Sequence, residues 1–196
     1  MTGGPRSNIS AAMHAAVGRP LARQVSFPVA ESDIRRWAIA VYYPQPPPRL
    51  FWDAGYARST RHGGIVAPEE FNPFAWMAAE RDEPASARPG DDLDHPERLL
   101  GIPGPGLRHQ LNGGVSVAYG TRMRPGDVIT SVSRLAGYSE RTGRLGLMLF
   151  TVTEDTWTND EGTLVKVTSS TLIRYLTAAG VVTGRGTAAP CSRGRP

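Results

Sequence analysis

The clearest periodic pattern in the chain lies between residues 32 and 43, where apolar side chains recur every three or four positions. The apolar positions that share one helical face are Ile34, Trp37, Ala38, Val41 and Tyr42. Ser32 precedes them as the expected N-cap, and Pro44 follows them where a helix must end. The pattern predicts an α-helix of about three turns that packs one face on a core.

The second half of the chain alternates apolar and polar residues in runs separated by turn sequences. The runs cover residues 115–119, 128–138, 145–157 and 164–176. The turn sequences, rich in Gly, Asp, Asn and Arg, fall at residues 124–127, 141–144 and 159–162. Four strands joined by short turns predict an antiparallel meander, and residues 24–29 predict one further short strand.

Two more helices are expected before the strands. Asp53 is a suitable N-cap for a short helix over residues 53–60. Residues 71–79 are apolar nearly all round and follow Pro68 and two glutamates, which favour a first helical turn. A helix without a polar face is buried on every side. The elements together predict an α+β fold in which a curved antiparallel sheet wraps a central helix.

The chain length of 196 residues fits one domain with tails. We expect this domain over residues 21–176 and flexible tails over residues 1–20 and 177–196. Residues 80–107 are rich in Pro, Gly, Asp and Arg and show no periodicity, which predicts a long surface excursion. A loop of that length in a small domain is commonly functional or mobile.

The net charge of +4 comes from the ends of the chain. Six arginines and no acidic residue occupy residues 1–26 and 185–196, so no nucleic-acid-binding surface is expected in the domain. The single cysteine, Cys191, excludes an intrachain disulfide and a cysteine-based metal site, and we expect no metal. No apolar run reaches the roughly 20 residues of a membrane-spanning helix, and no secretion signal precedes the domain. We therefore expect a cytoplasmic protein without membrane contact.

Three ordered blocks of sequence carry a resemblance to a known family. The blocks are residues 33–38 with 52–57, residues 63–71, and residues 111–114 with 124–129 and 171–175. They resemble MaoC-like hydratases and dehydratases of the hotdog fold, and more closely the fatty-acid-synthase-like N-terminal dehydratase half. The resemblance implies two hotdog units side by side with an acyl thioester, carried by CoA or an acyl carrier protein, in a tunnel between them.

The resemblance also implies an acid–base pair that this sequence lacks. Catalytic members carry Gly-Asp-x-Asn-Pro-x-His after the first helix, because hydration of a conjugated double bond requires a base for the water and an acid for the α-carbon. Aligned on Asp53 and Tyr56, the histidine falls on Phe51 and the aspartate near Pro46. Neither side chain transfers protons, so we expect a degenerate loop and no catalytic residue in this chain.

Other titratable residues are candidates for a displaced base. Asp53 is better explained as an N-cap, and His62 as a solvent-facing loop residue. His14 and His95 lie in the expected tail and in the expected excursion. His109, just before the third block, is the strongest remaining candidate, followed by Asp53.

Two glycine-containing segments are expected to bind substrate. The expected substrate-binding residues are Gly63, Gly64, Ile65, Val66, Ala67, Asn112 and Gly113. The glycine pair allows the backbone to approach a ligand, and the helix expected after it would offer its N-terminus to an oxyanion. Alternatively, the pair only allows the turn into a buried helix. Asn112 lines the tunnel mouth or, alternatively, begins a strand with a bulge.

These observations predict a non-catalytic, substrate-binding subunit of an (R)-type enoyl-thioester hydratase or dehydratase. A second, MaoC-like hotdog subunit would supply the aspartate and the histidine. We expect a hetero-oligomer, with a homodimer as the alternative, and no cofactor apart from the thioester substrate. Two other functions stay open: a self-contained hydratase with a displaced base, and a non-catalytic protein that binds acyl thioesters or assists assembly.

Overall fold

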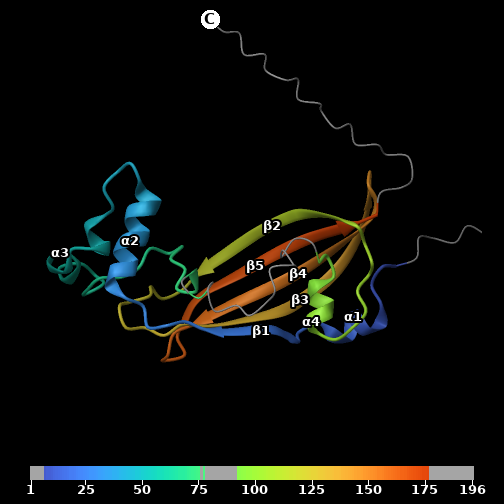
Figure 1. Cartoon of the computed structure of the whole chain (residues 1–196), viewed down its shortest axis with the longest axis horizontal. Coiled ribbons are helices and arrows are strands. Elements are labelled where there is room, and N and C mark those ends of the chain that lie inside the picture. Colours follow the sequence, from blue (N-terminus) through green and yellow to red (C-terminus); the bar gives the residue numbers. More distant parts are fainter. Residues whose placement is uncertain (1–6, 76, 78–91, 177–196) are drawn as a thin grey trace, which may run out of the picture.

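The computed structural model describes residues 7–75, 77 and 92–176. A five-stranded antiparallel sheet with the order β1-β3-β4-β5-β2 runs through the middle of the molecule (Figure 1). The strands are β1 Pro20–Val25, β2 His109–Tyr119, β3 Thr130–Gly143, β4 Gly146–Thr158 and β5 Leu164–Tyr175. The alternating pattern predicted β3, β4 and β5 and their sequential pairing.

The position of β2 differs from the predicted four-stranded meander. β2 pairs with β5, from His109 opposite Tyr175 to Tyr119 opposite Lys166. Residues 120–129 therefore carry the chain past the ends of β5 and β4 before β3 begins. The prediction was wrong here because alternation shows which residues share a face, while it contains no information on which strand is the neighbour.

The helix expected from the apolar period is α2 (Glu31–Tyr42), and Ile34 and Ala38 on its inner face are fully buried. Its N-cap is Ala30 and not Ser32. At 12 residues α2 is the longest described helix, and none of the described helices has the length and hydropathy to span a membrane.

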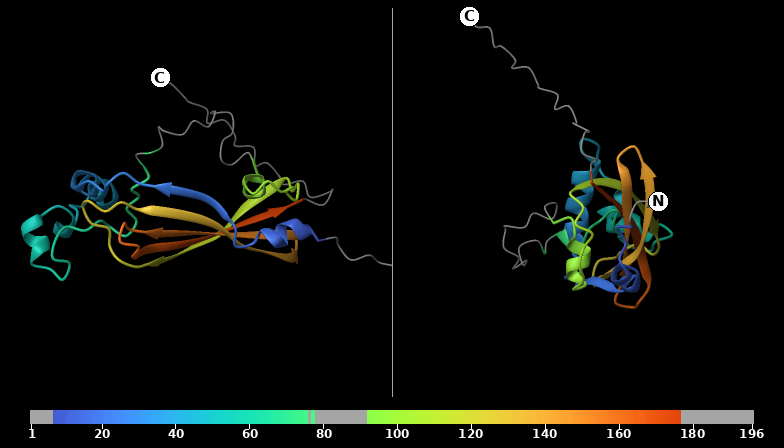
Figure 2. Two further views of the ribbon diagram at one scale, coloured as in Figure 1. Left: turned by 90° about the horizontal axis from the view of Figure 1, so that it is seen from below. Right: turned by 90° about the vertical axis from the view of Figure 1, so that its right-hand side faces the viewer.

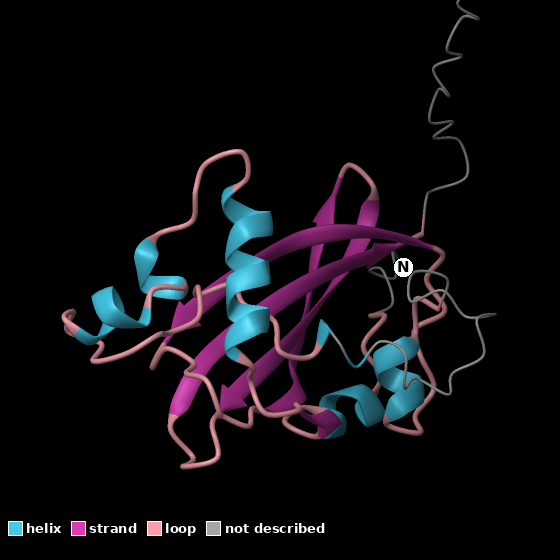
Figure 3. Cartoon of the chain, turned by 60° about the vertical axis from the view of Figure 1, so that its left-hand side comes forward, coloured by secondary structure: helices cyan, strands magenta, loops and turns pink. Residues whose placement is uncertain are grey.

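One end of the sheet carries the larger apolar cluster of the described chain. η1 (Arg49–Phe51) and α3 (Ala54–Arg58) lie with α2 beyond the strand ends there (Figures 1 and 3). The buried cluster members are Val29, Ile34, Ala38, Phe51, Ala57, Ile65, Ala67, Phe71, Met123, Ile129 and Val165. These helices and loops, which are far apart in sequence, share one core.

The segment before β1 is not the flexible tail expected up to residue 20. Ser10 is the N-cap of α1 (Ala11–Ala16), and its Oγ accepts a hydrogen bond from the Met13 amide at 3.2 Å. Met13 and Ala16 are buried against the other end of the sheet, where α1 lies in Figure 2. The prediction failed because a helix of six residues has too few positions to show a period.

The expected surface excursion over residues 80–107 is also partly wrong. α4 (His95–Leu99) forms within it, and Glu97 of this helix is fully buried. Leu100 and Leu107 are buried with it, so residues 92–107 pack on the sheet, while residues 80–91 lie outside the described chain.

No α-helix begins at the start of the apolar segment over residues 71–79. The amides of Phe71, Ala75 and Met77 each bond to the carbonyl three residues earlier, as in consecutive tight turns. Asn72 contributes to this change, because its side-chain oxygen accepts the Phe74 amide at 3.0 Å and competes with helical bonding. Residues 76, 78 and 79 lie outside the described chain.

Candidate functional site

Gly63 and Gly64 form the turn that leads from α3 into the larger core. Gly63 has φ +67°, and its amide donates to the Thr60 carbonyl at 3.0 Å. A Cβ on Gly64 would approach only Nη1 of Arg124, at 3.9 Å, so one side of the turn is open toward that arginine. Residues 65–75, all described, contain no α-helix. The helix N-terminus that was expected to hold an oxyanion after the pair is therefore not formed there.

The three residues after the glycine pair belong to the core. Ile65, Val66 and Ala67 are all buried. The Ala67 amide donates to the Met123 carbonyl at 2.8 Å, and the Ala67 carbonyl accepts from Nη1 of Arg122 at 3.1 Å. Their side chains thus stabilise this end of the fold within the single chain.

A pocket of about 300 Å³, which we call the arginine pocket, lies beside the glycine turn. It is lined by Arg61, His62, Glu69, Gly120, Thr121, Arg122 and Arg124. The first two residues follow α3, and the last four follow β2. The larger core holds both segments in place, because Ala57 of α3 and Met123 belong to the same cluster.

The arginines of the pocket interact with His62 and Glu69, and one hydrogen bond connects the segment after α3 to the segment after β2. Arg124 Nη2 donates to the His62 carbonyl at 2.7 Å, and Arg61 Nε donates to His62 Nε2 at 3.4 Å. Arg122 Nη2 forms an ion pair with Glu69 Oε1 at 2.8 Å. Burial and then the positive charges of the three arginines lower the pKa of His62 below its usual value. The potential in this pocket is therefore positive.

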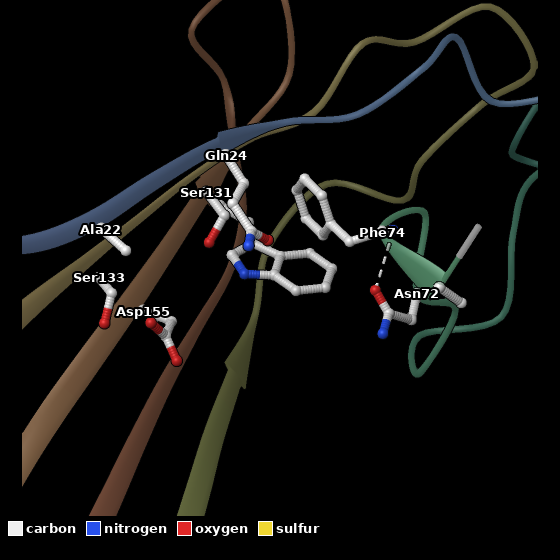
Figure 4. A pocket seen from close by; sticks show the side chains of 9 residues that line it. Ala22, Gln24, Asn72, Phe74, Ser131, Ser133 and Asp155 are labelled. Atoms are coloured by element: carbon white, nitrogen blue, oxygen red, sulfur yellow. Dashed lines mark hydrogen bonds between the residues drawn. The ribbon is translucent and has the colours of Figure 1, made fainter. Parts of the chain in front are cut away.

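A second pocket of about 430 Å³ lies where residues 72–75 cross β1, β3 and β4 (Figure 4). It is lined by Ala22, Gln24, Asn72, Phe74, Ala75, Ser131, Ser133, Asp155 and Trp157. Phe74 and Trp157 pack edge to face with 4.9 Å between ring centroids and form an apolar wall. Trp157 belongs to β4, and its neighbours on the sheet present amide, hydroxyl and carboxylate groups from Gln24, Ser131, Ser133 and Asp155. A lining of this kind suits a ligand with both apolar and hydrogen-bonding parts.

Asn112 and Gly113 lie on β2, far from the glycine turn. The register of β2 against β5 shifts between Asn112 and Gly114, and the Asn112 side chain accepts the Gly114 amide at 3.0 Å. This is the bulge that was one of the two interpretations of the segment. Asn112 and Gly120 of the arginine pocket are eight positions apart, up to about 26 Å of extended strand at 3.3 Å per residue. The two expected substrate-binding segments are not brought together in this chain.

The loop that was expected to be degenerate has one end in the core and the rest at the surface. Phe51 is 5% exposed, ends η1 and belongs to the larger core, with its ring 6.0 Å from that of Tyr42. Pro46 is exposed on the loop before η1. The indole Nε1 of Trp52 donates to the Pro47 carbonyl at 3.0 Å and closes this loop.

Asp53 is the N-cap of α3, as the sequence predicted. Its Oδ1 accepts the Tyr56 amide at 2.9 Å, and its Oδ2 pairs with Arg49 Nη2 at 2.6 Å. The Tyr56 amide first, and then the Arg49 guanidinium, hold the pKa of Asp53 below its usual value. Both carboxylate oxygens are thus used in local structure.

The histidines are dispersed over the fold. His109 begins β2 and stacks on Tyr175, with 5.3 Å between ring centroids. His14 is exposed on α1, and Nδ1 of His95 lies 2.8 Å from Nη2 of Arg98 on α4. His62 alone of the four lies in one of the two pockets described above. It is half-buried, so the expectation of a solvent-facing residue holds only in part.

Sequence reasoning did not identify the arginine pocket. Arg122 and Arg124 flank Met123 directly before the turn at residues 125–127, and this Arg-x-Arg pattern is the one local signal. Arg61 is distant from them in the sequence, because its neighbour His62 lies 62 positions before Arg124. Only the folded chain brings them together.

The sheet, its strand order and the helices at its ends define a hotdog fold. A chain of the ChsH1-ChsH2 complex from Mycobacterium tuberculosis has 18% sequence identity and a TM-score of 0.59, over 87% of this chain and 92% of that chain. A protein described as a MaoC-like dehydratase has 19% identity and a TM-score of 0.54, over 93% of this chain and 54% of that chain. At such identities the likeness shows the fold, and the predicted antiparallel α+β hotdog architecture is confirmed. The central helix expected over residues 71–79 is not an α-helix over its described residues.

The family follows from the sequence itself. Residues 15–168 match the family model of the FAS1-like dehydratase domain region. Because this match covers most of the chain, the chain belongs to that family of hotdog dehydratases, and the resemblance to MaoC-like proteins is confirmed. No curated protein matches the chain at a significant level.

Proposed function

We propose that this chain is the substrate-binding, non-catalytic subunit of an (R)-type enoyl-thioester hydratase or dehydratase. In this proposal a second, MaoC-like hotdog subunit supplies the aspartate and the histidine. The observation that carries the proposal is the place of Phe51. Phe51, on which the family's histidine is expected to fall, is buried in the core and has no titratable group, and Pro46 is expected near the position of the aspartate.

The candidates for a displaced base support the same conclusion. Asp53 is engaged by the Tyr56 amide and by Arg49, and its lowered pKa makes it a weak base. His109 lies at the opposite end of β2 from Gly120 of the arginine pocket, 11 positions away, which is about 36 Å of fully extended strand at 3.3 Å per residue. Neither is placed to act beside the glycine turn.

The free edge of β2 supports a second subunit. Each of its 11 residues is exposed, and Val115, at 59% exposure, and Val117 project from it. The opposite edge, β1, has six residues, begins with Pro20 and contains a register shift, all of which discourage pairing. A long exposed apolar edge is suited to pairing with another strand. The ChsH1-ChsH2 structure, by its description a complex, supports a hetero-oligomer of hotdog chains.

The test compares the chain alone with the chain mixed with a MaoC-like subunit that carries an intact Gly-Asp-x-Asn-Pro-x-His loop. Hydration is followed by the loss of the enoyl-thioester absorbance. We expect no turnover by the chain alone, turnover by the mixture, and loss of turnover when the partner's loop aspartate is replaced by asparagine.

Two results would contradict the proposal. Turnover by the pure chain that is lost in His109→Ala, with loss of one limb of the pH–rate profile, would indicate a self-contained hydratase. If an acyl-CoA raises the thermal stability of the chain, but mixtures of the chain with any hotdog partner show no turnover, the protein only binds the thioester. In the second case the chain would be a carrier or assembly protein.

A further inference from the structure

The arginine pocket contains more positive charge than the surrounding protein neutralises. Three guanidinium groups line it, and Glu69 forms its one ion pair among the described residues, with Arg122. Arg61 and Arg124 have no carboxylate partner in the part of the chain that the structure describes, and both bond instead to His62. Like charges held together in this way favour the binding of an anion.

The floor of the pocket between the arginines is formed at Gly120 and Thr121, whose backbone is held against β5. A Cβ on Gly120 would collide with the backbone of Leu164, so this position admits only glycine. Its amide donates to the Val165 carbonyl at 2.8 Å, and the Thr121 amide donates to the Leu164 carbonyl at 2.9 Å. β5 thus fixes the floor of the pocket, and the long guanidinium side chains form its walls. Guanidinium groups bind phosphate oxygens with paired hydrogen bonds.

The arginine pocket lies next to the end of β2, the strand with the free edge. Gly120, Thr121, Arg122 and Arg124 directly follow Tyr119, the last residue of β2. On the other side is the open face of the Gly63-Gly64 turn. A ligand in the pocket would therefore lie beside the strand at which we place the partner subunit.

From these contacts we infer that the arginine pocket binds the phosphate groups of the carrier to which the acyl thioester is attached. The identity of the carrier rests on the proposed function, while the anion-binding property does not. The shared chemistry is a phosphate ester or diphosphate, held by Arg61 and Arg124, with Arg122 fixed by Glu69 as a positioning residue. CoA and a phosphopantetheinylated acyl carrier protein are the two sources of this chemistry.

The first experiment measures binding of pyrophosphate and of CoA to the full chain by titration calorimetry, with pantetheine as an uncharged probe. We expect both anions to bind, pantetheine to bind much more weakly, and affinity to fall as salt rises. Arg61→Ala and Arg124→Ala should each weaken pyrophosphate binding about tenfold, or about 1.4 kcal/mol. Arg61→Lys keeps the charge but loses the paired hydrogen bonds, so it should bind pyrophosphate more tightly than Arg61→Ala and more weakly than the unchanged chain.

The matched control is Arg144→Ala, because Arg144 is an exposed arginine in the β3–β4 hairpin at the opposite end of the sheet. It should bind pyrophosphate as the unchanged chain does. The inference is overturned if neither anion binds, or if the Arg61→Ala/Arg124→Ala double variant binds pyrophosphate with unchanged affinity while its unfolding midpoint is also unchanged.

A second set of ligands distinguishes the two sources. Displacement of bound pyrophosphate by adenosine 3′,5′-bisphosphate indicates CoA as the source. Binding of a phosphopantetheinylated carrier protein that adenosine 3′,5′-bisphosphate does not displace indicates the carrier protein.

In the complex with a catalytic partner, Arg61→Ala should raise KM and leave kcat unchanged. Arg61-dependent pyrophosphate binding without turnover in any complex would reject the proposed function alone. Turnover with an unchanged KM in Arg61→Ala would reject the phosphate subsite alone.

Discussion

Arg174 of β5 and Glu97 of α4 form an ion pair in which both side chains are fully buried, with 2.6 Å between Nη2 and Oε1. Arg174 also donates to Thr151 Oγ1 at 2.8 Å and to the Leu93 carbonyl at 2.7 Å. The Tyr138 hydroxyl donates to Glu97 Oε1 at 2.6 Å. This network ties α4 to three adjacent strands, β3, β4 and β5. Arg174 also forms an ion pair with Asp94 Oδ1 at 3.1 Å, so it keeps one partly exposed carboxylate partner if Glu97 is removed.

We therefore predict that Glu97→Ala lowers the free energy of unfolding by up to about 3–5 kcal/mol, the usual cost of breaking a buried ion pair. The loss is at the lower end of this range if the remaining pair of Arg174 with Asp94 compensates for part of it. Urea unfolding followed by tryptophan fluorescence measures the change. Asp92→Ala is the matched control, because it removes the exposed ion pair with Arg98 at 2.6 Å. Exposed pairs contribute at most about 1 kcal/mol. Equal losses in the two variants would contradict a structural role for the buried pair.

The same pair predicts how stability depends on pH. Burial by itself raises the pKa of Glu97, but hydrogen bonds from Arg174 and Tyr138 overcome it and hold the pKa below the ordinary value of 4.5. The folded state thus binds a proton at Glu97 less readily than the unfolded state. Its stabilising contribution is complete above the ordinary pKa and is lost as the pH falls through it toward the lowered value.

Urea midpoints measured between about pH 7 and pH 3 test this dependence. Glu97→Gln should lose less stability over the acid range than the unchanged chain does, because it has no proton to gain at this position. Parallel curves for the two proteins would show that Glu97 does not contribute to the acid sensitivity.

Phe51 is predicted to act through packing. Phe51→Ala should lower the free energy of unfolding by about 3–5 kcal/mol, as for other buried phenylalanines. Pro46→Ala, at an exposed position of the same loop, should change it by no more than about 0.5 kcal/mol. Phe51→His should also destabilise the chain and should not produce hydratase activity in the chain alone. Turnover in that variant would show that the position still faces a substrate.

The edge of β2 is predicted to hold the partner subunit. Val117→Lys should weaken association with the partner at least about tenfold, because a lysine on a strand edge opposes pairing with another strand. Val25→Lys is the matched control: Val25 is an equally apolar, 37% exposed residue on β1, at the other edge. Sedimentation of the mixed subunits measures both. A larger effect at Val25 would place the partner on β1.

The sequence alone predicted the features whose signal lies within a few residues. The spacing of Ile34 and Ala38 was sufficient for α2, because helical period and burial coincide there. Asp53 was recognised as an N-cap because capping depends on a side chain and an amide three positions apart. The resemblance predicted that the family's histidine falls on Phe51, since that comparison needs only the order of residues, and this stays a prediction.

Only the tertiary structure decided the contacts between segments that are distant in the chain. The pairing of β2 with β5, the ion pair of Glu97 with Arg174 across 77 residues, and the meeting of Arg61 with Arg124 left no local pattern. A charged residue in a Pro- and Gly-rich segment is expected at the surface unless its partner is known, and the partner is known only after folding. Alternation and period report which face of an element is buried, whereas the choice of neighbour depends on the packing of the whole chain.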